Sequence, residues 1–185
     1  MGDPETTVLQ GKVFERMISA AEINEKVVSL ARQIKSDVGD EVPLFLCILK
    51  GSFVFASDLM RAYDGLCEVE FVRLTSYQGT HSTGSVKTML GMDFSKLNGR
   101  RVVVVEDIID TGLTMQSLLG ELQNHAPKTL NVATLFVKPE KLRCDIDIKY
   151  SCFDIPDAFI VGYGLDCDEK YRNLPAIYVL KEQEN

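Results

Sequence analysis

Residues 101–114 read RVVVVEDIIDTGLT, and this segment is the clearest indication of the chain's architecture. The nearly pure valine run from Arg101 to Val105 is typical of a parallel strand that helices cover on both faces. A polar loop is expected from Glu106 to Gly112, followed by a helix from about Thr114 to Asn124. A further strand is expected from Val132 to Val137, so the unit is strand, loop, helix, strand.

The same alternation is present upstream of this unit. Ser19 to Glu22 matches a capping box, which predicts a helix that ends near Gly39. A buried strand is predicted from Leu44 to Leu49, a helix from Ser52 to Tyr63 and a strand from Cys67 to Leu74. This order predicts an α/β fold with an open, mostly parallel twisted sheet flanked by helices. Ligands in such folds bind at the carboxyl ends of the strands.

Two regions of the chain are less regular. The glycine-, serine- and threonine-rich segment 76–91 predicts a long flexible loop, with a lid over a binding site favoured over a plain hairpin extension. Short apolar runs at 148–153, 158–161 and 177–180 indicate a small hood beside the main sheet. The polar ends, Met1 to Thr7 and Glu182 to Asn185, are expected to fray.

Composition limits the class of protein. The 185 residues suit a single domain, 1–185. The 27 acidic and 20 basic residues give a net charge of -7, which argues against nucleic-acid or anionic-membrane partners. No stretch approaches the ~18 apolar residues of a membrane span, and no signal peptide is recognisable. Five scattered cysteines without a C-x-x-C pair suit reduced thiols in the cytoplasm, and two distant histidines offer little basis for a histidine metal site.

Carboxylates and hydroxyls meet where the valine strand leads into the next helix. A helix N terminus offers unpaired N–H groups, Thr111 and Thr114 add hydroxyls, and Gly112 allows close approach of an anion, so a phosphate cradle is predicted. Glu106 and Asp107 would repel a bare phosphate, which favours a sugar phosphate or a bridging magnesium ion. The alternative is a solvated strand end at which Asp110 or Thr111 caps the helix. The segment lacks the Gly-Lys-Ser/Thr ending of a P-loop.

Residues 106–114 resemble the phosphoribosyl-diphosphate signature of the type I phosphoribosyltransferases. Further motifs from about Phe14 to Val179 follow the order seen in the hypoxanthine-guanine branch: Leu49-Lys50-Gly51, Ser76-Tyr77, Lys138, Ile155-Pro156-Asp157, Phe159, Gly162-Tyr163, Asp166 and Arg172. The resemblance implies a magnesium-dependent purine-salvage transferase. Its substrates would be 5-phosphoribosyl 1-diphosphate and hypoxanthine or guanine, its products IMP or GMP and pyrophosphate, and its assembly a homodimer or homotetramer.

The resemblance assigns the sugar and the catalytic proton to the segment after the valine strand. It implies that Glu106 and Asp107 hold the ribose hydroxyls, directly or through magnesium. Asp110 is implied to lie between sugar and base, among the ribose- and phosphate-binding residues, and to be the general base that takes the proton from purine N7. The residues implied to hold the 5-phosphate are Thr111, Gly112, Leu113 and Thr114, and a lysine stands at position 113 in vertebrate relatives.

The resemblance assigns the base and the pyrophosphate to more distant residues. Lys138 would donate to the exocyclic oxygen of a 6-oxopurine, and Phe159 would stack on the ring. Ile108, Ile160 and Asp166 complete the implied purine site, and Asp166 would also be a ligand of a second magnesium ion. The implied pyrophosphate contacts are Lys50, Gly51 and Arg172, and the implied lid begins at Ser76 and Tyr77. Ser52 replaces the second glycine of the Lys-Gly-Gly loop of vertebrate relatives.

From the residues alone, ordinary structural roles remain open for three of these side chains. Lys138 could be a surface lysine that snorkels, Phe159 a core residue and Asp166 a solvated loop residue. At the level of function, three alternatives remain: a related transferase for another base, a regulatory RNA-binding relative, and a noncatalytic nucleotide-binding module.

Overall fold

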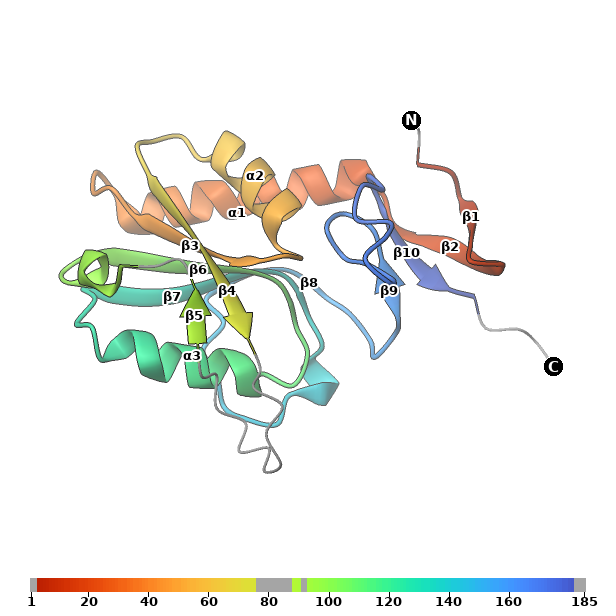
Figure 1. Ribbon diagram of the computed structural model, residues 1–185. Helices are drawn as coiled ribbons and strands as arrows, with labels where there is room; N and C mark the ends of the chain where they lie inside the picture. The colour runs from red at the N-terminus through yellow and green to blue at the C-terminus, as the bar shows by residue number, and fades with distance from the viewer. Residues whose placement is uncertain (1–2, 76–87, 91–92, 182–185) are drawn as a thin grey trace, which may run out of the picture.

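The computed structural model describes residues 3–75, 88–90 and 93–181. Within these residues, the main sheet has six strands in the order β5-β4-β3-β6-β7-β8, with β5 antiparallel to β4 and the other neighbours parallel (Figure 1). The bounds are β3 (Leu44–Leu49), β4 (Glu68–Thr75), β5 (Thr88–Leu90), β6 (Arg101–Ile109), β7 (Thr129–Val137) and β8 (Tyr150–Asp154). The predicted α/β class with a mostly parallel sheet is confirmed.

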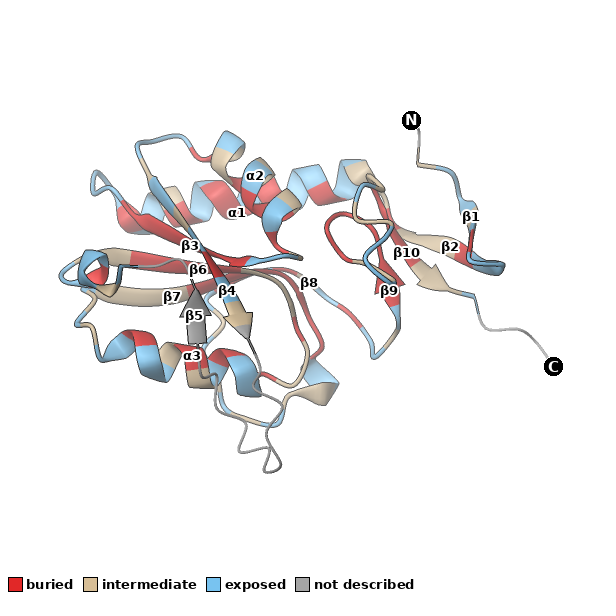
Figure 2. Ribbon diagram, in the orientation of Figure 1, coloured by how far each residue is buried: buried red, intermediate tan, exposed pale blue. Residues whose placement is uncertain are grey.

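Helices cover both faces of this sheet. In Figure 1, α1 (Ala20–Val38) and α2 (Phe53–Ala62) lie on one face and α3 (Leu113–Gln123) on the other. Side chains alternate between the faces along each strand, so Phe45 and Cys47 join the core under α1 and α2, while Leu44 and Leu46 join the core against α3. Buried positions accordingly gather along the central strands (Figure 2). Burial on both sides explains the unbroken valine run.

The first helix begins as its sequence predicts. The Ser19 hydroxyl accepts a hydrogen bond from the Glu22 N–H at 3.3 Å, and the Glu22 carboxylate accepts one from the Ser19 N–H at 2.9 Å. Gly39, at φ 68°, ends the helix in a conformation that favours glycine. The capping box and the end of α1 near Gly39 are therefore confirmed. None of the helices in the described ranges is long and apolar enough to cross a lipid bilayer.

Both ends of the chain contribute to a small antiparallel hood beside the main sheet (Figure 1). Its order is β1-β2-β10-β9, with bounds β1 (Thr6–Leu9), β2 (Lys12–Ile18), β9 (Ile160–Val161) and β10 (Ile177–Leu180). Gln10 and Gly11, both at positive φ, form the two-residue turn between β1 and β2. The prediction of a frayed start is wrong for Thr6 and Thr7, because β1 pairs along its whole length with β2.

Two predicted loops are shorter than expected. β6 continues past Val105, because its pairing with β7 runs on to Ile109, so the loop that was expected from Glu106 begins only at Asp110. Residues 88–90 form β5, which pairs with β4, so the loop prediction is wrong for these three residues. The remainder of the expected loop, with Ser76 and Tyr77, lies outside the described residues, as do 182–185. Within the described residues, two short 3-10 helices, η1 (Phe94–Leu97) and η2 (Pro139–Lys141), complete the elements.

Candidate active site

The predicted site residues gather where β3 and β6 diverge. The pairing of β3 with β6 ends at Cys47 and Val105, whereas β6 stays paired with β7 as far as Ile109. The chain proceeds from β3 toward β4 on one side and from β6 toward β7 on the other, so this is the point at which the strand order reverses. Parallel sheets bind ligands in the crevice at such a point, beyond the carboxyl ends of the strands.

A cavity of about 220 Å³ lies at the end of β6. Its lining brings together most of the predicted sugar-phosphate residues and the predicted Ile108: Leu74, Glu106, Ile108, Ile109, Asp110, Thr111, Gly112, Thr114 and Met115. Asp107 and Leu113 were predicted with this group but do not line the cavity, and Leu113 is 44% exposed. The sequence-predicted segment therefore forms one pocket, with two of its members turned elsewhere.

The start of α3 provides the anion-binding part of this pocket. Gly112 is the N-cap, at φ 77°, and no side chain makes a capping hydrogen bond, so the alternative in which Asp110 or Thr111 caps the helix is wrong. A Cβ on Gly112 would lie 2.9 Å from the Cys144 sulfur and 3.3 Å from Leu142, so only glycine fits the turn. Helix N–H groups without a side-chain partner, beside the Thr111 and Thr114 side chains, suit a phosphate.

Glu106 and Asp107 form an acid pair at this edge of the sheet. Burial of its carboxyl group, and then the neighbouring Asp107 carboxylate, raise the pKa of Glu106 well above its ordinary value. The Asp107 N–H donates to Glu106 Oε1 at 3.2 Å. Asp107 packs against the loop after β3, since a Cβ on Gly51 would lie 1.5 Å from Asp107 Oδ2. Two crowded carboxyl groups favour a cation between them and a ligand that donates hydroxyl hydrogens.

The acid pair and Asp166 are not brought together. Asp166 forms an ion pair with Arg172 at 2.7 Å and accepts a hydrogen bond from the Glu169 N–H at 2.8 Å. Over residues 3–75, 88–90 and 93–181, no three histidine, cysteine or acidic side chains form a cluster ready for a metal ion. The donor chemistry of Glu106 and Asp107 fits magnesium, which prefers carboxylate oxygens and keeps several water ligands.

Asp110 belongs to a cluster of four charged side chains at the end of β7. Lys138 lies 3.0 Å from Asp157 and 3.8 Å from Asp110, and Lys141 lies 3.1 Å from Asp110 and 3.2 Å from Asp157. The Lys138 side chain is only 9% exposed, so its interpretation as a snorkelling surface lysine is wrong. Hydrogen bonds to Asp110 and Asp157 raise the pKa of Lys141, and hydrogen bonds from Lys138 and Lys141 lower the pKa of Asp157.

Phe159 and Ile160 lie at the hood. The Phe159 side chain is 50% exposed, and its ring centroid lies 6.4 Å from that of Phe14. Phe159 is therefore no core residue, and it borders a second cavity of about 210 Å³ under the hood rather than the one that contains Asp110. Ile160 is buried in β9, where it pairs with Val179 of β10.

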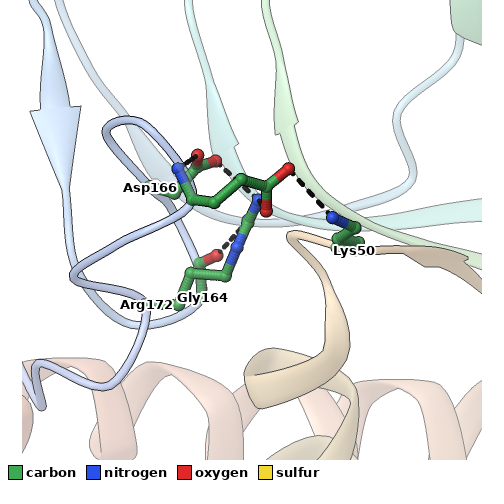
Figure 3. Close-up of polar contacts among 5 residues, drawn as sticks. Lys50, Gly164, Asp166 and Arg172 are labelled. Atoms are coloured by element: carbon green, nitrogen blue, oxygen red, sulfur yellow. Dashed lines mark hydrogen bonds and ion pairs between the residues drawn. The ribbon is translucent and has the colours of Figure 1, made fainter.

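The loop after β3 and the loop before β10 meet in a network of polar contacts (Figure 3). Lys50 follows a cis peptide bond and lies 2.9 Å from the Glu169 carboxylate, which lies 3.3 Å from Arg172. Arg172 also donates to the Gly164 carbonyl at 2.7 Å. A Cβ on Gly164 would lie 2.2 Å from the Gly51 carbonyl oxygen, so glycine allows the two loops to touch. The structure thus brings together Lys50, Gly51, Asp166 and Arg172.

Ser52 lies in the loop after β3. The side chain is fully buried, and its hydroxyl donates to the Ile48 carbonyl at 2.5 Å. This hydrogen bond satisfies the only polar group that the serine adds.

Three charged residues of the site were not predicted as site residues: Lys141, Asp157 and Glu169. Lys141 could have been predicted from the sequence. Pro139 favours a turn at this point, and Lys141 follows Lys138 by three residues, which is the spacing of one 3-10 turn. Asp157 appeared only as part of a motif. Nothing in the sequence indicated a role for Glu169. Its backbone adopts a positive φ of 61°, a conformation that a glutamate does not predict.

Comparisons with known proteins show which family the chain belongs to. Residues 19–168 match the family described as "Phosphoribosyl transferase domain". The chain is 40% identical over 177 residues to a hypoxanthine-guanine phosphoribosyltransferase of Streptococcus thermophilus, an alignment that covers 95% of this chain and 98% of the relative. A relative from Streptococcus pyogenes with the same name is also 40% identical over 177 residues, with the same coverage.

Solved structures show the same likeness. A hypoxanthine-guanine phosphoribosyltransferase from Bacillus anthracis is 45% identical, with a TM-score of 0.84 over 90% of this chain and 98% of that one. A Trypanosoma cruzi hypoxanthine phosphoribosyltransferase, solved as a ternary substrates complex, is 34% identical, with a TM-score of 0.83 over 90% and 94% of the two chains. The chain therefore belongs to the phosphoribosyltransferase family, in its hypoxanthine-guanine branch.

Proposed function

We propose that this chain transfers the phosphoribosyl group of 5-phosphoribosyl 1-diphosphate to hypoxanthine or guanine, and that it releases pyrophosphate with IMP or GMP. The observation that carries the proposal is the single cavity in which the start of α3, the Glu106 carboxyl group and Asp110 meet. The start of α3 and the Glu106 carboxyl group suit a sugar phosphate, and Asp110 suits a purine base that loses a proton. A relative named hypoxanthine-guanine phosphoribosyltransferase, which aligns with 95% of the chain, supports this function.

In this proposal the sugar-phosphate part of the substrate lies along residues 106–114. The start of α3, with the hydroxyls of Thr111 and Thr114, binds the 5-phosphate, and Glu106 and Asp107 accept hydrogen bonds from the ribose hydroxyls. The bond from the anomeric carbon to the diphosphate breaks as a purine ring nitrogen forms a bond to that carbon. The sugar becomes cationic in between, and the nearby carboxylates stabilise this charge.

Asp110 and Lys138 act on the base. Asp110 takes the proton that the purine loses at N7, and Lys138, which lies 3.8 Å from Asp110, donates to the exocyclic oxygen at position 6. Adenine has a donor amino group at that position, which cannot accept a hydrogen bond from the Lys138 ammonium. Phe159 and Ile108 are the proposed apolar contacts of the ring, and Ile160 contributes backbone hydrogen bonds.

Lys50, Gly51 and Arg172 bind the diphosphate in this proposal. Glu106 and Asp107 would hold magnesium, with Asp166 as the proposed ligand of a second ion. Bound magnesium would neutralise diphosphate charge and so favour departure of the leaving group. The five cysteines of the chain are all free, which supports a reducing, cytoplasmic setting, and a homodimer or homotetramer is the proposed assembly.

One assay tests the proposed function. Purified protein with magnesium and 5-phosphoribosyl 1-diphosphate is mixed separately with hypoxanthine, guanine, xanthine and adenine, and nucleotide formation is followed by absorbance. Activity is expected with hypoxanthine or guanine and almost none with adenine. Absence of pyrophosphate release with all four bases would favour a noncatalytic nucleotide-binding module, and salt-dependent RNA binding would favour a regulatory relative.

Replacing Glu169 with glutamine is expected to tighten pyrophosphate binding. The Glu169 carboxylate lies between the two proposed diphosphate-binding cations, 2.9 Å from Lys50 and 3.3 Å from Arg172, and so competes with an incoming anion. Both contacts are solvent-exposed, so the dissociation constant of pyrophosphate is expected to fall by only about two- to fivefold, as calorimetry would measure. Glu25→Gln, on the exposed face of α1, should change nothing. Weaker binding to Glu169→Gln would show that the carboxylate instead holds the two loops in place.

A further inference from the structure

Two lysines and two aspartates form a charge-balanced cluster around the proposed general base. Each ammonium group lies within 4 Å of both carboxylates, but the distances are unequal. Lys138 is nearer to Asp157, at 3.0 Å, than to Asp110, at 3.8 Å. Lys141 lies 3.1 Å from Asp110, so the nearest cation to Asp110 in this cluster is Lys141 and not Lys138.

Lys141 is held at this site by the backbone. Pro139 begins η2, and the Lys141 N–H donates to the Lys138 carbonyl at 3.0 Å. In a 3-10 turn the side chains three residues apart lie on the same side, so Lys138 and Lys141 both face the two aspartates. The Lys141 side chain is 32% exposed, compared with 9% for Lys138, so Lys141 closes the outer side of the cluster.

The two oxygens of Asp110 differ in their contacts. Oδ2 accepts a hydrogen bond from Lys141 at 3.3 Å. Oδ1 is shielded from solvent and lies 3.1 Å from the Lys141 ammonium, but it takes part in no hydrogen bond among the described residues. Lys141 thus lies near both carboxylate oxygens of Asp110 and balances their charge.

We propose that Lys141 is a positioning residue, which supplies the counter-ion of Asp110 and so leaves Lys138 free to donate to the exocyclic oxygen of the purine. Without Lys141, the two carboxylates would share Lys138 as the one cation of this cluster, and Lys138 would be drawn between them. The donor for the base would then be less available. The inference rests on the proposed function, because it needs Lys138 to contact the base.

The test compares Lys141→Met with the wild-type protein in steady-state kinetics. The KM for hypoxanthine is expected to rise about tenfold, as for loss of a charged hydrogen bond, while the KM for 5-phosphoribosyl 1-diphosphate stays within about twofold. The preference for hypoxanthine over adenine should fall in parallel. Lys141→Arg should largely restore the wild-type KM for hypoxanthine and the wild-type base preference, because it returns the positive charge. Lys128→Met is the matched control, since Lys128 is also paired, 2.8 Å from Glu41, but follows α3 at the opposite end of the sheet.

The outcomes separate this inference from the proposed function. A wild-type protein that makes no nucleotide with any base would overturn the proposed function. An active wild-type protein whose Lys141→Met variant keeps its KM for hypoxanthine and its base preference would overturn only the role of Lys141. Equal increases in both KM values, without rescue by arginine, would also overturn it, because they would indicate general damage to the site. Lys141→Gln provides a second neutral variant if the methionine variant does not fold.

Discussion

Asp110→Asn is expected to lower kcat with hypoxanthine by about 10²- to 10⁴-fold, the usual contribution of a general base. Asparagine has the shape of aspartate but cannot take a proton from purine N7. Binding of 5-phosphoribosyl 1-diphosphate should change little, because the phosphate is expected to contact the start of α3 rather than this carboxylate. The measurement is the single-turnover rate with hypoxanthine, together with the dissociation constant of 5-phosphoribosyl 1-diphosphate from calorimetry.

A second aspartate provides the control for this result. Asp37 is also paired, since it lies 2.8 Å from Lys149 and accepts a hydrogen bond from the Tyr150 hydroxyl at 2.9 Å, but α1 carries it away from the cavity. Asp37→Asn should therefore keep a kcat close to wild type even if it lowers the melting temperature. A kcat of Asp110→Asn that also stays close to wild type would remove Asp110 as the base.

The parts of the fold that the sequence predicted correctly are those in which local signals and burial agree. The capping box at Ser19 and the buried runs of β3 and β6 each specify one conformation, so the positions of these elements and the parallel sheet could be predicted from them. The hood was predicted less well. β1 is only four residues long and half polar, and its pairing with β2 depends on the positive φ values of Gln10 and Gly11, which composition does not reveal.

The candidate site was predicted best where neighbours in sequence are also neighbours in space. Most of residues 106–114 line one cavity because a strand end and a helix start are continuous in the chain. The approach of Asp107 to Gly51, and of Glu169 to Lys50, joins loops far apart in sequence, and only the packed structure shows such contacts. The end of β6 was misjudged for a related reason: Glu106 is polar, yet its pairing with Thr134 keeps it in the strand.

Lys138→Ala is expected to lower the preference for hypoxanthine over adenine, measured as the ratio of the two kcat/KM values. The lysine is the most buried cation of its cluster, with 9% of its side chain exposed, so a base that accepts its hydrogen bond gains more than a surface contact would give. Loss of such a bond costs about 1–3 kcal/mol, which corresponds to a fall of about 5- to 150-fold in that ratio.

The fold should tolerate this change, because Lys141 stays within 3.2 Å of both aspartates and still balances part of their charge. Lys138→Met separates the two contributions of the side chain, since methionine keeps the apolar stem and loses only the ammonium group. If both variants lose discrimination equally, the ammonium is the selective element. If only the alanine variant loses discrimination, the apolar stem of the lysine acts by packing. If neither variant loses discrimination, Lys138 does not recognise the base.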